Sequence, residues 1–474
     1  MEFADALALA TDPADPAELF RLMVGRIEAR APGIGRSDLA AEWETAKRRR
    51  RGEQPVLSAV PAALKMMFDF YFRNDLYGHW IDSAPLVLSS GSFDETVFGL
   101  PESLKECIRF SLDKNWYGYS DSLGRTSVRQ ALADLETTRF GGTQTINSDE
   151  IVVTLGGTAA VAAIVDFLAP ATGAPGTALC GVPNYPPLIA AVDRRFDVEL
   201  VTTPPMDGQT DITALIERAR AGARLILLQT VTNPHGLRVP EEQIARLVAA
   251  APDDCVIVLD ECHDTFGPPV PLSPARRSPK VVTIRSISKR WCAPGLKAGW
   301  LVASPAFVAD FYHHASTTYG GPPSIFYLFL EIFARFEAGW LGGRFDAEAE
   351  LARLSDDYGL RRETLQAAYG DYLHWAADLE QRVVRQRRHA VDALRALDVP
   401  VVEPDYSINL VAQLGDDDSY VTYRRLISEA GVSVYPGLLS LQGGRGLVRI
   451  SPCIPEEILA DALHRIGGFL HRAQ

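Results

Sequence analysis

The feature that most constrains the fold is a regular alternation of short apolar runs and helical stretches between about residues 150 and 305. Apolar runs stand at 151–155, 177–182, 224–230, 255–260 and 281–288, and stretches typical of helices follow the first three. Short strands that are apolar on both faces are typical of a parallel sheet covered by helices on either side. The pattern therefore predicts an α/β fold with a mostly parallel central sheet flanked by helices.

The sequence on either side of this core has a different character. In the stretch AELFRLMVGRIEA, apolar residues recur at helical spacing, and residues 330–395 are charged and helical in pattern. The C-terminal runs VVEPDYSINLVAQL, GVSVYPG and GLVRISP are typical of strands. We therefore expect an N-terminal helical extension (1–85), a large α/β domain (86–325), a helical connecting or inserted segment (326–395) and a small C-terminal α+β domain (396–474), with the chain ends forming the smaller domain.

Charge and cysteine content exclude several classes of protein. The net charge of −13 disfavours non-specific binding to nucleic acid or to an anionic membrane, and the basic run at 47–51 is interpreted as a solvated helix end. No apolar run reaches about 18 residues, so no transmembrane helix is expected. The six cysteines contain no CxxC pair, which argues against a zinc site and a disulfide framework. With no secretory signal at the N-terminus, a cytoplasmic protein without a structural metal is expected.

Polar residues that could bind a ligand or take part in a reaction follow the predicted strands. Gly157 and Thr158 follow the run at 151–155, and Asn233 follows the run at 224–230. Glycines and free backbone N–H groups at a helix start bind phosphate, although a plain tight turn explains the same residues. Asn233 could donate to a ligand oxygen or simply form a turn. Ligands bind beyond the carboxyl ends of strands in such sheets, so both positions are candidate contacts.

Two further strand ends carry charged residues. Asp260 ends the run at 255–260, where a buried carboxylate requires a cationic partner; the alternatives are a helix N-cap and a salt bridge. Lys289 follows the last run in the sequence SISK. A lysine at the mouth of a sheet can form a Schiff base when its pKa is lowered, whereas a surface lysine is the simpler interpretation of this residue alone.

The order of these motifs resembles that of the class I/II aminotransferases, which are fold-type I enzymes dependent on pyridoxal 5′-phosphate. The segments that carry the resemblance are YSDSLG, VTLGGTAA, PNYP, TNPHG, LDE, SISKRWCAPGLKAGW and VRIS. The resemblance as a whole extends from about residue 86 to the C-terminus. The resemblance implies a pyridoxal phosphate cofactor, a small-molecule amino-acid substrate, and a homodimer with shared active sites.

The resemblance also implies a role for each matching residue. Lys289 is the Schiff-base lysine, and the implied cofactor contacts are Gly157, Thr158 and Ser286 near the phosphate, Tyr185 stacked on the pyridine ring, Asn233 at the ring hydroxyl, Asp260 at the pyridine nitrogen, and Tyr119 at the phosphate of the partner subunit. Arg449 is expected to bind the substrate carboxylate, and Gly91, in the turn SSGSFDE, is expected to lie beside the substrate.

Three positions depart from the family's pattern. His263 stands where most members have a tyrosine that binds the ring oxygen, and the DExH sequence is more similar to the oxoamine synthases. Lys297 replaces the phosphate-binding arginine, which keeps the positive charge but loses bidentate geometry. His235 stands inside the NPxG motif, where threonine is common. His235 and His263 together could form an acid/base pair, or either could simply be packed.

The main functional interpretation is transfer of an amino group between an amino acid and a 2-oxo acid, with Lys289 moving the Cα proton. The alternative is a divergent member that catalyses β/γ-elimination or replacement, cyclisation or oxidation of an amino acid in a biosynthetic pathway, with S-adenosylmethionine- or arginine-derived substrates among the options. A third interpretation, a regulatory domain that only binds the cofactor, conflicts with the presence of Lys289, Asp260 and Arg449. No helix-turn-helix is evident in the sequence.

Overall fold

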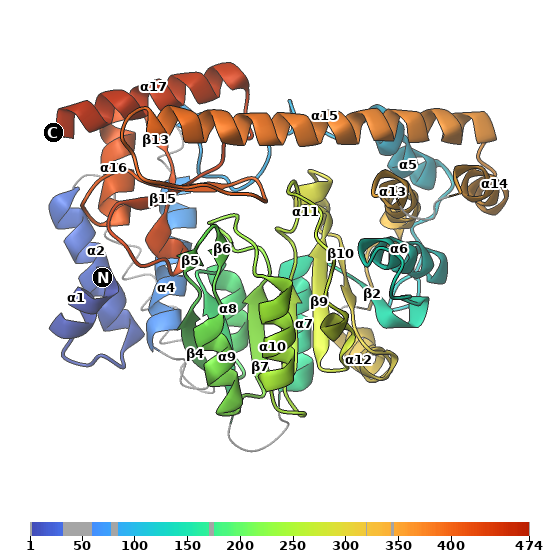
Figure 1. Cartoon of the computed structure of the whole chain (residues 1–474), viewed down its shortest axis with the longest axis horizontal. Helices are drawn as coiled ribbons and strands as arrows, with labels where there is room; N and C mark the ends of the chain where they lie inside the picture. The colour runs from blue at the N-terminus through green and yellow to red at the C-terminus, as the bar shows by residue number, and fades with distance from the viewer. Residues whose placement is uncertain are drawn as a thin grey trace.

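A computed structural model describes residues 2–31, 59–76, 84–169, 175–318, 320–342 and 346–473; the basic run at 47–51 lies outside these ranges. The central sheet contains β2 (Ile151–Thr154), β3 (Thr177–Val182), β4 (Asp197–Thr202), β7 (Leu225–Gln229), β8 (Val256–Asp260), β9 (Val281–Ser286) and β10 (Gly299–Val302). Its strand order is β2-β10-β9-β8-β7-β3-β4, and Figure 1 shows it at the centre of the molecule.

The sheet confirms the predicted α/β core and adds two strands to it. All five apolar runs are strands, but β9 ends at Ser286, where the chain turns into the short helix α11 (Ile287–Arg290). β4 mixes polar and apolar residues because it is an edge strand, and β10 is antiparallel to both β2 and β9. The other pairs, from β9 to β4, are parallel. The carboxyl ends of β7, β8 and β9 therefore meet at one edge.

Helices cover both faces of this sheet. One face packs against α7 (Gly157–Leu168), α8 (Pro186–Asp193) and α12 (Pro305–Thr318), and the other against α9 (Thr213–Arg220) and α10 (Glu241–Ala250). β7 shows the alternation clearly: Leu225 and Leu227 join the first core, whereas Ile226 and Leu228 join the second. Burial of apolar side chains on both faces explains why this strand is apolar throughout.

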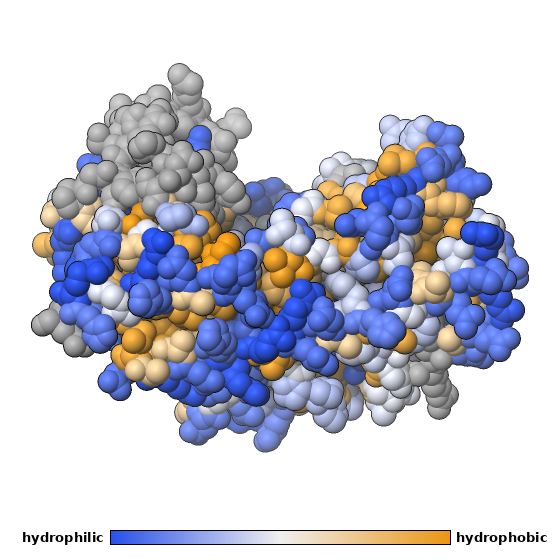
Figure 2. All heavy atoms as spheres, turned by 90° about the horizontal axis from the view of Figure 1, so that it is seen from above, coloured by the Kyte–Doolittle hydropathy of each residue, from blue (hydrophilic) through white to orange (hydrophobic). Residues whose placement is uncertain are grey.

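A third core lies at the β2 edge of the sheet. It is formed with α5 (Glu102–Asp113), α6 (Thr126–Arg139), α13 (Tyr327–Trp340), α14 (Ala347–Tyr358) and the first part of α15 (Arg362–Arg395). The 34-residue helix α15 then runs along the top of the molecule in Figure 1 and places Val391 and Leu394 in the core of the smaller domain. Polar residues interspersed with apolar patches cover the face seen from above in Figure 2.

The smaller domain contains a four-stranded antiparallel sheet of order β11-β12-β15-β14. Its elements are β11 (Val401–Val402), β12 (Leu410–Gln413), α16 (Ser419–Ala430), β14 (Tyr435–Pro436), β15 (Leu447–Ile450) and α17 (Glu456–Ala473). β1 (Leu86–Val87) pairs in parallel with β13 (Val432–Ser433), so both ends of the chain contribute to this region.

The N-terminal elements share the core of the smaller domain. They are α1 (Glu2–Leu9), α2 (Pro16–Arg30), α4 (Ala59–Phe70) and the π-helix η1 (Tyr71–Leu76). Minor elements are the hairpin β5 (Pro205–Met206) and β6 (Gln209–Thr210) and the 3-10 helices Ser148–Glu150, Pro274–Arg277, Pro294–Leu296, Ser324–Phe326 and η7 (Gly437–Ser440). Among the helices of the described ranges, none combines the length and the apolar character needed to cross a membrane.

Candidate active site

Lys289 lies on α11, directly after the carboxyl end of β9. Ser286 caps this helix, and its Oγ accepts a hydrogen bond from the backbone N of Ser288 at 3.1 Å. The Lys289 Nζ is buried and donates to the carbonyl oxygen of Gly91. Burial, helped by the positive charge of Arg449, lowers the pKa of the Lys289 amine to about 8. A larger fraction of this amine is therefore neutral at physiological pH than in an ordinary lysine.

Arg449, on β15 of the smaller domain, lies on the other side of Gly91. Its Nη2 donates to the carbonyl oxygen of Ser89 at 2.9 Å, and its guanidinium lies 4.0 Å from the ring centroid of Tyr435. Gly91 has φ of +60°, and a Cβ atom there would come within 2.6 Å of Arg449 Nη2. Glycine is therefore required at position 91, both for the backbone conformation and for the close approach of the guanidinium.

Asn233 and Asp260 are linked through Gln229, which the sequence analysis missed. Arg449 Nη1 lies 3.4 Å from Asn233 Oδ1, and the Asn233 backbone N donates to Gln229 Oε1 at 3.1 Å. Gln229 Nε2 in turn donates to Asp260 Oδ2 at 3.1 Å. The structure thus joins Lys289, through Gly91 and Arg449, to Asn233 and Asp260. The signal for Gln229 was a polar residue at the end of the apolar run RLILLQT.

His263 joins this cluster, whereas His235 contacts a different part of the smaller domain. His263 Nδ1 lies 2.6 Å from Ser407 Oγ. Burial, together with the charges of Lys289 and Arg449, holds the pKa of the His263 imidazole well below its usual range. His235 Nε2 lies 2.8 Å from Gln442 Nε2, and burial lowers its pKa to about 4. Both rings are neutral at pH 7, and their hydrogen-bond partners differ, which gives no support to a joint acid/base pair.

Gly157 begins α7 and lies against the loop after β8. A Cβ atom at Gly157 would come within 2.6 Å of Cys262 Sγ, so the two loops are in close contact. Thr158 and Lys297 are exposed at this edge. A Cβ at the neighbouring Gly156 would lie 3.8 Å from the carbonyl carbon of Lys297, which places these loops together. The first N–H groups of α7 have no partner within the helix and can bind an anion.

Tyr185 and Tyr119 occupy very different environments. Tyr185 is half-buried at the start of α8, and its ring lies 5.5 Å from that of Phe68. Tyr119 is fully exposed, with a relative exposure of 109%. Within a single chain the structure therefore brings Tyr119 together with none of the other predicted site residues among those it describes.

The smaller domain supplies further polar residues that were not predicted. Ser451 Oγ lies 2.8 Å from Asn409 Oδ1 and accepts a hydrogen bond from the Gly91 backbone N at 3.0 Å. Asn409 Nδ2 donates to Asn233 Oδ1 at 3.4 Å. The only sequence signal for Asn409 was a polar residue among the apolar residues of SINLV. These contacts connect the smaller domain to Gly91 and to Asn233 of the large domain.

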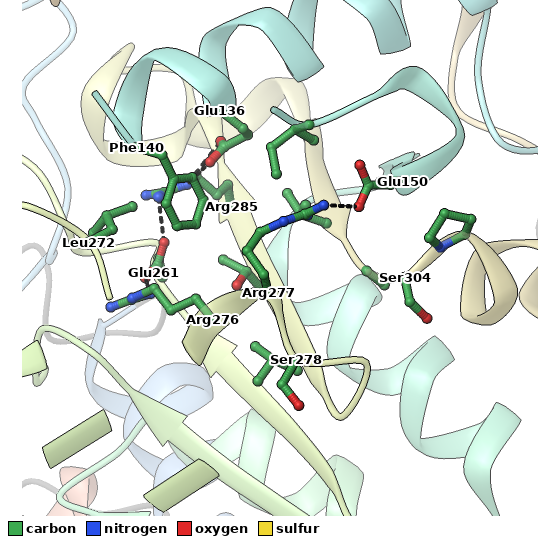
Figure 3. A pocket seen from close by; sticks show the side chains of 16 residues that line it. Glu136, Phe140, Glu150, Glu261, Leu272, Arg276, Arg277, Ser278, Arg285 and Ser304 are labelled. Carbon is green, nitrogen blue, oxygen red and sulfur yellow. Dashed lines mark hydrogen bonds and ion pairs between the residues drawn. The ribbon is translucent and has the colours of Figure 1, made fainter. Parts of the chain in front are cut away.

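A buried charge network lies behind the site, on the opposite face of the sheet from Asp260. Side chains alternate along a strand, so Glu261 and Arg285 point away from Asp260 and Ser286. Figure 3 shows Glu261 between Arg276 and Arg285, and Arg285 also pairs with Glu136 at 3.0 Å. A cavity of about 130 Å³ lies among these residues. Because its arginines are paired with carboxylates, the network braces the ends of β8 and β9.

The comparisons with known proteins agree with this architecture. Residues 85–466 match the family described as aminotransferase class I and II. The valine–pyruvate aminotransferase of Mycobacterium tuberculosis is 25% identical over 382 residues, which cover 78% of this chain and 88% of that protein. A histidinol-phosphate aminotransferase of Ralstonia nicotianae is 27% identical over 150 residues, which cover 31% of this chain and 40% of that protein.

Solved structures share the fold. The aspartate aminotransferase of Thermus thermophilus with maleate aligns with a TM-score of 0.64 and 21% identity, covering 93% of this chain and 98% of that one. The aromatic aminotransferase of Pyrococcus horikoshii aligns with a TM-score of 0.65 and 19% identity, covering 82% and 96%. The fold is thus that of the fold-type I enzymes, a group that depends on pyridoxal phosphate. With a family match over most of its length, the chain belongs to the class I and II aminotransferases.

Proposed function

We propose that the protein transfers an amino group between an amino acid and a 2-oxo acid, with pyridoxal 5′-phosphate held by Lys289. The observation that carries this proposal is the placement of Lys289. Its buried amine, with a pKa lowered to about 8, contacts Gly91 beside the guanidinium of Arg449. A nucleophilic amine next to a fixed carboxylate-binding group is the arrangement that chemistry on an α-amino acid requires.

The donor set fits pyridoxal phosphate. Within the described residues, the buried Asp260 carboxylate accepts hydrogen bonds from two neutral groups, the Gln229 amide and the Cys262 backbone N, and has no ion pair. A protonated pyridine nitrogen would supply the missing positive charge. The start of α7 at Gly157, with Thr158, Ser286 and Lys297 nearby in the fold, offers donors suited to a phosphate.

Each remaining residue has a proposed part in the reaction. Lys289 Nζ would hold the cofactor covalently, and once the substrate amine has displaced it, the freed amine would move the proton at the substrate Cα as base and acid. Arg449 binds the α-carboxylate and orients the Cα–H bond. The cofactor, when bound, supplies an electron sink that stabilises negative charge at Cα. The ring of Tyr185 would pack on the cofactor ring, and Asn233 would donate to its hydroxyl oxygen.

His263 has a proposed role at the same oxygen. Because its imidazole is neutral, one ring nitrogen donates and the other accepts. We propose that Ser407 Oγ donates to His263 Nδ1, which leaves Nε2–H as a donor toward the ring oxygen. This would fill the place that a tyrosine takes in most members of the family.

The full exposure of Tyr119 supports a homodimer with shared active sites. An aromatic side chain with no cover in one chain is suited to burial against a second copy, where its hydroxyl would reach the partner's phosphate site. We further propose that the enzyme acts in the cytoplasm, which suits its six unpaired cysteines.

The substrate class is proposed from the relatives and from the site's aromatic residues. The Mycobacterium tuberculosis relative is named for valine and pyruvate, and the rings of Tyr185 and Tyr435 lie near Arg449. We therefore propose a neutral, apolar amino acid as amino donor. Elimination, replacement, cyclisation and oxidation receive no support from the relatives described above, which are all aminotransferases.

Borohydride trapping tests the central assignment. Pyridoxal phosphate added to wild-type protein should give absorbance at about 420 nm, and reduction should fix it permanently to Lys289. Lys280→Ala is a matched control, because the Lys280 Nζ binds the Ala251 carbonyl oxygen at the far end of β9. The control should be labelled like the wild type and Lys289→Ala should not be labelled. Reductive labelling of Lys289→Ala would overturn the assignment, and a panel of neutral amino acids with pyruvate then tests the reaction.

A further inference from the structure

An N-terminal helix that lies outside the family match packs between the two domains. The helix α4 and the π-helix η1 cover residues Ala59–Leu76, whereas the match begins at residue 85. α4 contacts α8 of the large domain and η7 of the smaller domain, and Figure 1 shows it between the N-terminal helices and the central sheet. This segment therefore touches the elements that carry Tyr185 on one side and the surroundings of Arg449 on the other.

Phe68 makes the contact with the large domain. Its ring is buried and meets the ring of Tyr185 edge to face, with centroids 5.5 Å apart and an interplanar angle of 83°. Edge-to-face packing restricts the rotation of both rings. Since Tyr185 is the proposed stacking partner of the cofactor, Phe68 fixes the plane on which the cofactor would rest.

Tyr71 makes the equivalent contact with the smaller domain. The ring centroids of Tyr71 and Tyr435 lie 5.3 Å apart, with an interplanar angle of 82°. The guanidinium of Arg449 lies 4.0 Å from the centroid of the Tyr435 ring. Tyr71 is fully buried, and its hydroxyl lies beside those of Ser89 and Ser433. The contact between its ring and Tyr435 is the one that leads to Arg449.

We propose that Phe68 and Tyr71 are positioning residues that set the spacing between Tyr185 and Arg449. Phe68 lies near the end of α4 and Tyr71 begins η1, so the two rings come from adjacent turns of one continuous helical segment. Tyr185 and Arg449 belong to different domains, and their separation determines where the substrate carboxylate lies relative to the cofactor ring. The inference rests on the proposed function, because it uses the roles proposed there for Tyr185 and Arg449.

Phe70 offers a matched control on the same helix. It is buried like Phe68, with exposures of 3% and 5%, but its ring faces Phe20 and Tyr420, at 6.2 and 6.3 Å, instead of the site. Phe68→Leu and Phe70→Leu remove the same atoms from equally buried positions. Any difference between them therefore reports contact with Tyr185 and not general loss of packing.

The experiment compares four variants by three measurements. They are Phe68→Leu, Phe70→Leu, Tyr71→Leu and Tyr71→Phe. The measurements are the dissociation constant of pyridoxal phosphate from the apo-protein, the dissociation constant of 2-methylalanine from the loaded protein, and the midpoint of thermal unfolding. The probe 2-methylalanine carries the α-carboxylate but no Cα proton, so its binding is read without turnover.

The expected pattern separates the two contacts. Phe68→Leu should weaken pyridoxal phosphate binding about three- to tenfold, as expected for one lost aromatic contact. Tyr71→Leu should weaken the binding of 2-methylalanine by a similar factor. Tyr71→Phe should bind 2-methylalanine like the wild type, because the ring is kept. Phe70→Leu should lower the unfolding midpoint as much as Phe68→Leu does, with both dissociation constants unchanged.

Two results would overturn the inference, and they differ from failure of the proposed function. Equal dissociation constants for Phe68→Leu and Phe70→Leu would show that α4 acts only through stability. Loss of 2-methylalanine binding in Tyr71→Phe would show that the hydroxyl, and not the ring, carries the effect. If the wild type itself binds no pyridoxal phosphate, the proposed function fails, and the inference fails with it.

Discussion

Replacing Glu261 by glutamine tests whether the buried network behind β8 stabilises the fold through charge pairing. Glu261 is almost fully buried and pairs with both Arg276 and Arg285. Burial by itself raises the pKa of its carboxyl, but the surrounding guanidinium groups outweigh burial and lower that pKa below its usual range. Glutamine keeps the shape and removes the charge, so the two guanidiniums would lose the carboxylate between them.

The magnitude follows from the cost of an uncompensated buried charge. Removing one partner of a buried ion pair costs about 3–5 kcal/mol, and the lower part of this range is expected because Arg276 also pairs with Glu241 and Arg285 also pairs with Glu136. In a domain of about 200 residues, 1 kcal/mol lowers the unfolding midpoint by about 2–4 °C. We therefore expect Glu261→Gln to lower the midpoint of the large domain by about 6–12 °C.

Thermal unfolding followed by circular dichroism measures this change, with Glu199→Gln as control. Glu199 forms a two-point contact with Arg218 at 2.5 and 2.7 Å, but this pair is exposed. Exposed pairs contribute little, so the control should unfold like the wild type. A midpoint for Glu261→Gln within 2 °C or so of the control would refute the reasoning, because the buried charges would then be compensated in another way.

The same network gives a pH dependence with a definite sign. A carboxyl whose pKa is lower in the folded state than in the unfolded state stabilises the fold above its ordinary pKa of 4.5. This stabilisation is lost as the pH falls through the lower, folded-state value. The stability gap between wild type and Glu261→Gln should therefore be full at pH 7 and should shrink below about pH 4.5.

Three further predictions concern the site. The rate at which pyridoxal phosphate attaches to the apo-protein should rise with pH, with a midpoint at about pH 8, because Lys289 becomes neutral there. Stopped-flow absorbance measures this rate, and a midpoint of the pH dependence near 10.5 would contradict the prediction. Gly157→Ala should weaken pyridoxal phosphate binding in a titration, because the new Cβ meets Cys262 Sγ, and Gly157→Ala/Cys262→Ala should recover it. Tyr119→Ala should leave the unfolding midpoint of dilute protein unchanged but weaken pyridoxal phosphate binding; an unchanged dissociation constant would argue against a shared site.

The core of the fold was predictable because burial on both faces leaves a strong compositional trace. Apolar runs such as 224–230 have few other interpretations inside a chain of this length. The direction of a strand leaves no such trace. β10 begins inside the segment SISKRWCAPGLKAGW, which also contains Lys297, and it lies antiparallel between β2 and β9. This direction depends on the path of the chain and not on its composition. β4 was missed because an edge strand tolerates polar residues.

The site was predictable where residues follow strands and unpredictable where the smaller domain reaches in. Asp260 and Lys289 stand at the ends of apolar runs, where the parallel sheet brings them to one edge. Ser407 and Asn409 meet His263 and Asn233 across more than 140 positions of sequence, and no local pattern announces such a contact. Tyr435 is a similar case, because nothing in the sequence around it predicts that its ring packs against the guanidinium of Arg449.

His235 shows how the structure changes a functional hypothesis into a prediction about pH. The sequence suggested a second acid/base histidine, but His235 instead lies between the domains, where its Nε2 meets Gln442 of the smaller domain at 2.8 Å. The nearby backbone N of Asn184 also donates across the boundary, to the Ser440 carbonyl oxygen at 2.9 Å. Burial lowers the pKa of His235 to about 4, so the ring stays neutral through the range in which histidines ordinarily titrate.

The pH profile of kcat/KM follows from these values. Because burial lowers the pKa of His235 to about 4 and holds that of His263 well below its usual range, the free enzyme should show no limb near the ordinary histidine value of 6.5. His235→Phe should keep the shape of the wild-type profile, because it removes a contact between domains and not a titrating group. A wild-type limb near 6.5 that disappears in His235→Phe would return this residue to the acid/base role and would place its ring closer to the reacting atoms than the contact with Gln442 allows.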